Sequence, residues 1–321
     1  MDNGRPILIV ANPASCRGRG RRTASLVAEA LRTRGRQVLL RETTARGDAE
    51  RLALEACQES RRRPGCVVAC GGDGTMQEVA NALATARRGL GDACPAMGLA
   101  PAGRCNDLAR ALGVSREPSQ IADVLAGGRT RATDLGRING RYFCTVATVG
   151  LDAEVSSFVD SMRVPLHGTM AYLFGALWVL SRYRAPRVRL QGDFGTIDRP
   201  VFVASSANTS SYGGAIEIAP GAVPTDGLLD VCVIEAVSRR RALALIASVL
   251  RHRHLLEREV QLLRTRQLTV DADKPLLLWA DGERVATTPA VIEAVPGAVH
   301  IALPAESSLP ERGATPASRR N

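Results

Sequence analysis

Cys66-Val67-Val68-Ala69-Cys70-Gly71-Gly72-Asp73-Gly74-Thr75 is the stretch that decides how the first half of this chain folds. Its apolar run predicts a buried strand, and the glycines predict a sharp turn into a helix near residues 76–88. Because glycine lacks a Cβ atom, backbone N–H groups in such a turn can approach a phosphate closely. Asp73 has two interpretations: it is the N-cap of that helix, or its carboxylate acts beside Mg²⁺ or a reacting hydroxyl.

The chain from residue 7 to about residue 133 repeats this alternation of short apolar runs and helical stretches. Strands are expected at Ile7–Ala11, Gln37–Arg41, Cys66–Cys70 and Met97–Ala100, with helices near 22–34, 48–60 and 76–88. The alternation predicts an N-terminal, doubly wound α/β domain over residues 1–133, with a parallel sheet flanked by helices. We expect a C-terminal segment near residues 295–305 to complete its sheet.

The character of the sequence changes near Asp134, where short β-rich segments alternate with Gly, Pro, Asp and Asn. This pattern predicts a C-terminal antiparallel β-sandwich or barrel domain over residues 134–294. Helices are expected at Met170–Tyr183 and at Arg239–His252, the second with Ser238 as its N-cap. Residues 305–321 have the composition of a disordered tail.

Composition excludes several classes of protein. The chain has 321 residues and 45% hydrophobic content, which is enough for two domains with separate cores. Its eight cysteines include no CxxC pair and its four histidines form no cluster, so we expect reduced, packed thiols and no zinc site. The apolar stretch 171–180 is about half of the roughly 20 residues that a membrane span needs. With no signal-peptide pattern at the N-terminus, a cytoplasmic protein is expected.

The net charge of +10 comes almost entirely from arginine. It predicts attraction to polyanions or to an anionic membrane leaflet, with Arg239–Arg253 as a candidate contact surface. Solvated surface charge, with that segment as an ordinary solvent-facing helix, explains the excess equally well. Aromatic residues make up only 3% of the chain, which argues against binding of single-stranded nucleic acid.

Two further glycine-containing loops follow predicted strands, at Asn12–Gly20 and at Ala100–Asp107. Neither is a Walker A sequence. Loops at the carboxyl ends of neighbouring parallel strands line one crevice, so these two loops and Gly71–Gly74 are expected to face the same ligand. Three unrelated β–α turns are the alternative interpretation.

The β-rich half contains two acidic turns. Asp226 beside Gly227 is interpreted either as simple turn chemistry or as a ligand of a hard cation such as Mg²⁺. Asp281-Gly282, which precedes Glu283, is equally explained by a type I′ hairpin without function. Asp193-Phe194-Gly195 matches a protein-kinase metal triplet, but the other kinase motifs are missing, and a loop is predicted there.

Taken together, these residues resemble the diacylglycerol kinase catalytic-domain family, in its bacterial lipid kinase branch, which is similar to sphingosine and ceramide kinases. The resemblance covers nearly all of the chain before the tail, and its motifs are specific through their order and spacing. They are Asn12-Pro-Ala-Ser15, Gly71–Thr75 with Glu78, Pro101-Ala-Gly103 with Asn106–Arg110, Gly140–Phe143, Gly150–Ala153, Gly168–Tyr172, Ser210–Gly214, Ala219–Ala222, Asp226–Asp230 and Asp281–Glu283.

The resemblance implies an ATP-dependent kinase that uses Mg²⁺, with residues 1–133 as its nucleotide-binding domain and residues 134–294 as its lipid-substrate domain. It implies nucleotide contacts at Asn12, Pro13, Ala14, Ser15, Cys16, Thr44, Gly72, Asp73, Gly74, Thr75, Met76, Gln77 and Glu78. It implies a structural Mg²⁺ bound by the Asp226 carboxylate and the backbone carbonyls of Val223 and Leu228. Finally, it implies that Glu283 accepts a proton, with Asp281 and Asp73 as acidic companions.

Arg104-Cys105 departs from the Thr-Gly that members of the family usually carry there. Arg104 either replaces the missing hydroxyl with a charge-assisted phosphate contact or crowds the pocket. The leading hypothesis is ATP-dependent phosphorylation of a lipid hydroxyl, with diacylglycerol as the first candidate, by a cytoplasmic enzyme peripherally associated with an anionic membrane. No nucleic-acid partner is expected, and a homodimer is possible from the sequence. A soluble NAD-kinase-like enzyme and a non-catalytic nucleotide or lipid sensor are the alternatives.

Overall fold

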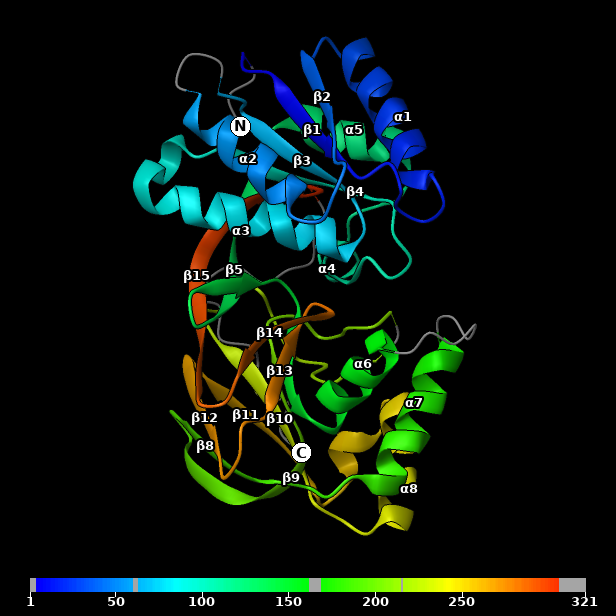
Figure 1. The fold of residues 1–321 in the computed structure, drawn as a ribbon. Coiled ribbons are helices and arrows are strands. Elements are labelled where there is room, and N and C mark those ends of the chain that lie inside the picture. Colours follow the sequence, from blue (N-terminus) through cyan, green and yellow to red (C-terminus); the bar gives the residue numbers. More distant parts are fainter. Residues whose placement is uncertain (1–3, 60–62, 162–168, 215, 306–321) are drawn as a thin grey trace. The chain divides into compact units, whose positions relative to one another are not determined.

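A computed structural model describes residues 4–59, 63–161, 169–214 and 216–305 (Figure 1). The tail predicted at residues 305–321 therefore lies, apart from its first residue, outside the described residues. The chain divides into two compact units. The first comprises Met1–Leu135, Val223–Gly227 and Val295–Asn321, and the second comprises Gly136–Ala222 and Leu228–Ala294.

The first unit contains a parallel sheet with the strand order β15-β4-β3-β1-β2. Its members are β1 (Ile7–Ala11), β2 (Val38–Glu42), β3 (Cys66–Gly71), β4 (Ala96–Pro101) and the last part of β15 (Ala290–Ala302). β1, β3 and β4 are buried along their whole length, which explains why their sequences are continuously apolar and do not alternate. The predicted doubly wound α/β class is confirmed.

Helices cover both faces of this sheet (Figure 1). α1 (Arg19–Thr33) and α5 (Pro118–Gly127) pack on the face that carries Ile7, Ile9 and Val68. α2 (Asp48–Gln58) and α3 (Asp73–Leu90) pack together on the opposite face. The unit also contains the short helix α4 (Asp107–Ala111) and the 3₁₀ turn η1 (Gly91–Ala93).

Glycines precede three of these helices. Gly18 and Gly47 have left-handed φ values of 91° and 86°, and Gly72 is the N-cap of α3. α3 consequently begins at Asp73, three residues before the predicted start. Asp73 is thus the first residue of the helix, and its interpretation as the N-cap of this helix is wrong.

The second unit is an antiparallel sandwich, as predicted for this half. The two sheets share the long strand β9 (Gly195–Ala207), whose first half pairs with β8 (Arg187–Gly192). Its second half pairs with β7 (Val146–Gly150) and β10 (Leu229–Glu235). The remaining strands of this unit are the last part of β5 (Thr130–Ile138), β6 (Arg141–Phe143), β11 (Val260–Thr265), β12 (Gln267–Ala272), β13 (Leu277–Ala280), β14 (Glu283–Thr287) and the first part of β15. Asp193 and Phe194 form the turn between β8 and β9, so the loop prediction is also correct.

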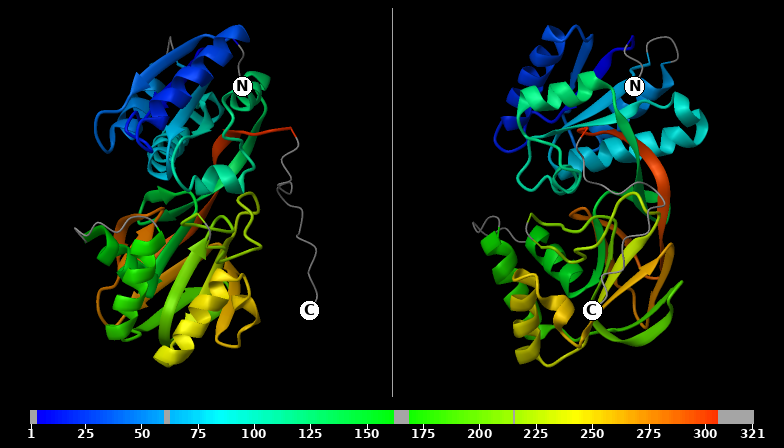
Figure 2. Two further views of the ribbon diagram at one scale, coloured as in Figure 1. Left: turned by 90° about the vertical axis from the view of Figure 1, so that its right-hand side faces the viewer. Right: turned by 180° about the vertical axis from the view of Figure 1, so that it is seen from behind.

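Three helices flank the sandwich: α6 (Leu151–Ser161), α7 (Thr169–Arg182) and α8 (Arg239–Leu250) (Figure 2). α7 and α8 match the predicted helices within two residues, and Ser238 caps α8 by accepting a hydrogen bond from the Arg241 N–H. Sequence analysis missed α6. Its three serines weaken the apolar pattern, and it starts directly after β7, where Gly150 has a φ of 104°.

The eight cysteines are all free thiols. The described residues contain no group of three or more His, Cys, Asp or Glu side chains arranged to bind a metal. Within the described ranges, no helix combines the length and the apolar character needed to span a bilayer.

Candidate functional site

The loop after β1 is held in an unusual backbone conformation. Cys16, Arg17 and Gly18 all have positive φ values, 45°, 58° and 91°. Two consecutive non-glycine residues with left-handed backbone dihedrals are energetically costly. Such strained segments concentrate at ligand-binding sites. The end of the loop returns so close to its start that only glycine fits at position 20. A Cβ atom on Gly20 would lie 1.9 Å from the carbonyl oxygen of Asn12.

Asp73 connects the loop after β3 to the loop after β4. Its two carboxylate oxygens accept hydrogen bonds from the backbone N–H groups of Asn106 (2.8 Å) and Asp107 (2.6 Å). These groups lie at the start of α4, so Asp73 satisfies the first donors of another helix. Burial and the neighbouring Asp107 carboxylate raise the pKa of Asp73 above its ordinary value, although the backbone hydrogen bonds oppose this shift.

The loop after β4 approaches the loop after β3 closely. A Cβ atom on Gly103 would lie 2.5 Å from the Cα atom of Gly72. Asn106, with a φ of 52°, accepts a hydrogen bond from the Gly103 N–H through its side chain. Ser15 Oγ donates a hydrogen bond of 3.4 Å to the Ala102 carbonyl and thereby connects the first loop to the same place.

The three loops line one cavity of about 810 Å³, as expected for loops at the carboxyl ends of neighbouring strands. The lining residues are Ala14, Ser15, Cys16, Arg17, Arg19, Gly72, Asp73, Gly103, Arg104 and Cys105. Three arginine side chains and closely approaching glycine backbone suit an anionic, phosphorylated ligand. Arg104 is exposed at this cavity, where it can contact such a ligand.

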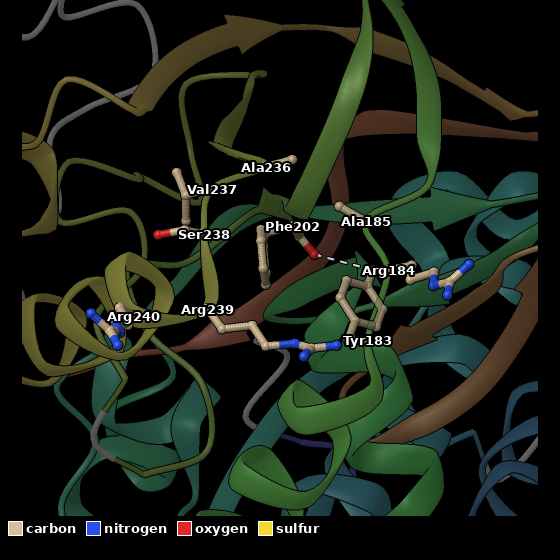
Figure 3. A pocket seen from close by; sticks show the side chains of 9 residues that line it. All are labelled: Tyr183, Arg184, Ala185, Phe202, Ala236, Val237, Ser238, Arg239 and Arg240. Carbon is tan, nitrogen blue, oxygen red and sulfur yellow. Dashed lines mark hydrogen bonds between the residues drawn. The ribbon is translucent and has the colours of Figure 1, made fainter.

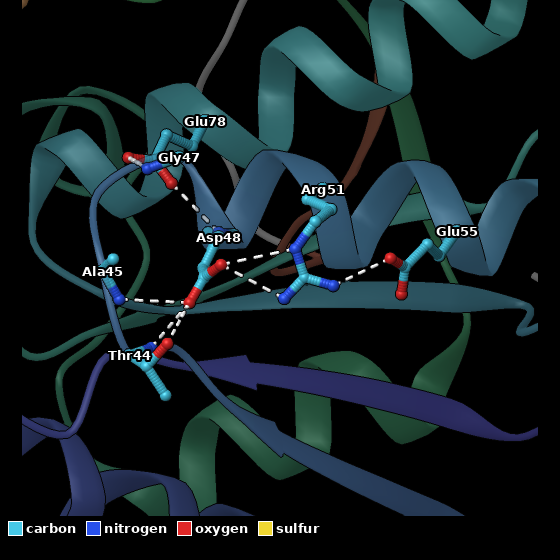
Figure 4. Close-up of polar contacts among 8 residues, drawn as sticks. Thr44, Ala45, Gly47, Asp48, Arg51, Glu55 and Glu78 are labelled. Atoms are coloured by element: carbon cyan, nitrogen blue, oxygen red, sulfur yellow. Dashed lines mark hydrogen bonds and ion pairs between the residues drawn. The ribbon is translucent and has the colours of Figure 1, made fainter.

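Other predicted nucleotide contacts have structural roles beside the cavity (Figure 4). The Thr44 hydroxyl donates to Asp48 (2.6 Å), and the Thr44 hydrogen bonds hold the pKa of Asp48 far below its ordinary range. The Glu78 carboxylate accepts hydrogen bonds from the Gly47 and Ala49 N–H groups at the start of α2. Each carboxylate thus satisfies backbone donors of a loop or helix end.

The remaining members of that predicted set pack inside the unit. Met76 and Gln77 are 0% exposed, so their side chains belong to the buried face of α3. Thr75 is also buried, and its hydroxyl lies 3.5 Å from Asn12 Nδ2. Asn12 Oδ1 accepts the Ala14 N–H, which shapes the first loop. Pro13 and Gly74 are not among the residues that line the cavity.

The acidic turn Val223–Gly227 is anchored by a residue that sequence analysis did not single out. Asp134 accepts the Gly227 N–H on one carboxylate oxygen and the Gly297 N–H on the other, both at 2.7 Å. The carbonyl of Val223 accepts the N–H groups of Thr225 and Asp226 within the turn. One carboxylate oxygen of Asp226 is buried. Carboxylate and carbonyl oxygens are the donors that Mg²⁺ prefers, so the turn suits this cation chemically.

Asp281 and Glu283 lie at the hairpin between β13 and β14. Asp281 and Gly282 have φ values of 51° and 81°, which fits the type I′ interpretation of this turn. Asp281 also has a second structural role, because its carboxylate accepts the Cys144 and Thr145 N–H groups at 2.6 and 2.8 Å. Glu283 starts β14 opposite Ala280 and is partly exposed.

Asp152, on α6, is a further acidic residue in the second unit to which sequence analysis gave no role. Burial raises its pKa, while hydrogen bonds with Tyr212 and Thr148 oppose this shift. The available signal was a carboxylate directly after the buried strand β7, within Gly150–Ala153. A buried carboxyl group with a raised pKa is a candidate for a functional role.

Comparisons with known proteins identify the same kind of relative for both halves of the chain. A family model described as "Diacylglycerol kinase catalytic domain" matches residues 6–138, and one described as "YegS C-terminal NAD kinase beta sandwich-like domain" matches residues 145–303. The diacylglycerol kinase of Mycobacterium tuberculosis is 34% identical over 93% of this chain and 95% of its own length. The diacylglycerol kinase of Bacillus subtilis is 28% identical over 94% of this chain and 97% of its own length.

A Pseudomonas fluorescens protein named "Probable lipid kinase YegS-like" is 33% identical over 88% of this chain and 90% of its own. Among solved structures, a putative diacylglycerol kinase from Bacillus anthracis superimposes with a TM-score of 0.75 and 19% identity, covering 94% of this chain and 98% of that chain. This likeness shows the same fold. The identities over nearly the whole chain place the protein in the family of bacterial diacylglycerol kinases and YegS-like lipid kinases, which are ATP-dependent phosphotransferases with an alcohol acceptor.

Proposed function

We propose that this protein transfers the terminal phosphoryl group of ATP to a lipid hydroxyl, with diacylglycerol as the first candidate acceptor. The observation that carries the proposal is the cavity of about 810 Å³ in the first unit, where three glycine-containing loops meet three arginines. Phosphoryl transfer depends mainly on alignment and charge neutralisation. Arg17, Arg19 and Arg104 supply positive charge, and the glycine backbone permits close approach of phosphate oxygens.

The first unit binds the nucleotide in this proposal. Asp73 is a positioning residue, because its carboxylate holds the start of α4 and thereby keeps the Gly72 and Gly103 loops together. Glu78 similarly fixes the start of α2 next to Thr44. These carboxylates fix the shape of the phosphate site without themselves neutralising phosphate charge.

Mg²⁺ would be held by the Asp226 carboxylate with the carbonyls of Val223 and Leu228. When bound, this structural Mg²⁺ would stabilise the turn, because a cation that binds only the folded state stabilises that state. The protein's own contribution is to fix this turn, which Asp134 does through the Gly227 N–H. An oxygen-only donor set of this kind favours a hard cation over zinc.

The second unit supplies the group that accepts the hydroxyl proton. We assign this role to Glu283, whose partly exposed carboxylate starts β14. Asp281 is its positioning residue, because it binds the backbone of Cys144 and Thr145 and so fixes the turn that carries Glu283. A lipid acceptor places the reaction at a membrane surface, and the net charge of +10 favours an anionic one.

The test is to offer radiolabelled ATP to the purified protein with diacylglycerol, a sphingoid base, glycerol and NAD in separate reactions. Label in diacylglycerol, Mg²⁺-dependent and lost in Glu283→Gln, is the expected result. The Glu283→Gln protein should still bind ATP, since its change lies outside the nucleotide cavity. Label in NAD would support a soluble NAD kinase, and label in none of the acceptors would support a nucleotide or lipid sensor. Either result would overturn the proposal.

A further inference from the structure

The second unit exposes an unusual number of large apolar side chains on α7, α8 and the 3₁₀ turn η2 (His254–Leu256). Leu256 is 84% exposed and Leu250 is 54% exposed. We call the whole set the α7–α8 surface; it consists of Phe174, Leu177, Trp178, Leu243, Leu250, Leu255 and Leu256. Several exposed large apolar side chains on elements that meet at one groove indicate an interaction site, whereas isolated exposed leucines are ordinary.

The exposed residues follow the helical period. Phe174, Leu177 and Trp178 are spaced i, i+3 and i+4 on α7, and Leu243 and Leu250 are spaced i and i+7 on α8. Each helix therefore has two apolar faces, one packed on the sandwich and one facing outward. Leu180, for example, belongs to the inward face and is 3% exposed.

Trp178 gives the α7–α8 surface an interfacial character. The chain has only two tryptophans; Trp279 is 7% exposed, whereas Trp178 is 44% exposed. The Trp178 ring stacks with Phe158 and Phe174, with centroids 6.1 and 6.2 Å apart, and the Arg182 guanidinium lies 3.9 Å above it. Tryptophan beside arginine is typical of the boundary between acyl chains and headgroups.

The charged side chains on the segments that carry these apolar residues are basic, while acidic partners such as Glu257 and Glu217 come from neighbouring segments. Residues 169–184 and 236–256 contain no Asp or Glu. Arg241 forms ion pairs with Glu257 and Glu259. Within the described part of the chain, by contrast, no ion pair involves the arginines nearest the apolar side chains, which are Arg182, Arg184, Arg239, Arg240, Arg251 and Arg253.

A groove of about 620 Å³ lies between the end of α7 and the start of α8 (Figure 3). Arg184, Arg239, Arg240 and Ser238 line it together with apolar side chains that include Phe202 and Val237. The Tyr183 hydroxyl, also in the lining, donates to the Phe202 carbonyl at 3.4 Å. A groove that presents both arginine and apolar side chains matches a phosphodiester joined to acyl chains.

We propose that the α7–α8 surface is the face on which this protein docks onto an anionic phospholipid leaflet, with one phospholipid headgroup in the groove. The inference rests on the proposed function, because a lipid acceptor requires contact with a membrane. The leucines and Trp178 enter the headgroup region, and the arginines bind phosphate oxygens. Each such arginine contributes about a fivefold gain in affinity for an anionic membrane.

The test measures co-sedimentation of the full-length protein with vesicles. One set contains phosphatidylcholine alone, and the other contains equal parts of phosphatidylcholine and phosphatidylglycerol. The groove variant is Arg184→Ala/Arg239→Ala/Arg240→Ala, and the tip variant is Leu255→Ser/Leu256→Ser. Matched controls are Arg189→Ala, on the distant strand β8, and Leu39→Ser, whose side chain is 48% exposed in the first unit.

We expect tight binding only to the phosphatidylglycerol vesicles. The groove variant should lose roughly a hundredfold in affinity and the tip variant at least about tenfold, while the controls stay within about twofold of wild type. A Lys-for-Arg version of the groove variant should recover most of the binding, which separates lost charge from misfolding. Equal binding by the groove variant and wild type, or equal binding to both vesicle types, would overturn the inference.

Kinase activity on dihexanoylglycerol, supplied below its aggregation limit, separates this inference from the proposed function. The groove and tip variants should phosphorylate this monomeric acceptor as fast as wild type and lose activity only on vesicle-borne diacylglycerol. If wild type phosphorylates no acceptor but the vesicle results hold, the proposed function fails and the docking surface stands.

Discussion

Asp73 shows how one carboxylate can hold two loops together beside a cavity that it also lines. Both of its oxygens accept backbone N–H groups from the start of α4. From the sequence alone, the same residue was a candidate for direct chemistry or for capping α3. Its actual partners lie 33 and 34 residues further along the chain, and no local pattern encodes that distance.

Asp73→Asn should therefore lower stability as well as activity. An amide group would direct N–H toward the N–H of Asn106 or Asp107, and loss of a charged hydrogen bond costs about 1.5–3 kcal/mol. Urea unfolding of the variant and wild type measures this difference. Asp92→Asn is the matched control, since the Asp92 side chain is 95% exposed and its ion pair with Arg87 should contribute less than about 1 kcal/mol. Identical unfolding midpoints for Asp73→Asn and wild type would contradict the positioning role.

Glu259 predicts a specific pH dependence. Hydrogen bonds from Arg241 lower the pKa of Glu259 from 4.5 to about 2. Because the pKa is depressed in the folded state, the stabilisation is fully present above pH 4.5 and is lost as the pH falls toward 2. The gap in urea midpoint between wild type and Glu259→Gln should consequently be constant near neutral pH and close below pH 4.5. If the difference in urea midpoint does not change with pH, the ion pair between Glu259 and Arg241 is not its source.

At the scale of elements, Gly103 permits the close spacing of two loops that line the cavity. Gly103 and Gly72 belong to loops after neighbouring strands, and a Cβ atom on Gly103 would lie 2.5 Å from the Cα atom of Gly72, so it could be accommodated only if the loops moved apart. The sequence predicted both loops and their shared cavity from the strand order expected of a doubly wound sheet. The contact between them depends on the twist and register of β3 and β4, which sequence pattern does not specify.

Gly103→Ala is expected to weaken ATP binding and to destabilise the first unit by about 1–3 kcal/mol, because it forces the two backbones apart. Isothermal titration with ATP and thermal unfolding measure the two effects. Gly89→Ala serves as the comparison: Gly89 lies inside α3 with open space around its Cα, so alanine should be neutral or stabilise by about 0.5–1 kcal/mol. Unchanged ATP affinity in Gly103→Ala would count against the cavity as the nucleotide site.

The acidic turns also differ in how far the sequence predicts them, since local turn geometry is predictable and long-range contacts are not. The sequence identified the Asp281-Gly282 hairpin, because consecutive positive φ values have a local sequence preference. It missed Asp134, whose partners Gly227 and Gly297 lie 93 and 163 residues away. Local chemistry was thus predictable in this chain, whereas carboxylates that bind distant backbone were not.

At the scale of the whole molecule, the chain passes between the two units four times, at residues 135/136, 222/223, 227/228 and 294/295. The first unit therefore contains a five-residue turn and a strand end that come from late in the sequence. Within it, Asp134 binds that turn, and Ile301 of β15 pairs with Met97 of β4.

A fragment that ends at residue 138 should consequently fail to fold, although it contains the entire match to the catalytic-domain model. It lacks the partners of Asp134 and the strand that covers β4. Dispersed amide resonances of this fragment, together with its protection from limited proteolysis, would show that it folds and would contradict the prediction. A chain that ends at Ala305 keeps every described element and should be as stable as the full protein.

During synthesis, this connectivity imposes an order of events. The first 135 residues leave the ribosome with the open edge of β4 exposed, and its neighbour in the sheet is among the last segments translated. At about 5–20 residues per second, that edge waits roughly ten to thirty seconds for closure. Nascent chains of this enzyme should therefore depend on chaperones, or on slow local codons, far more than a protein whose leading domain is contiguous.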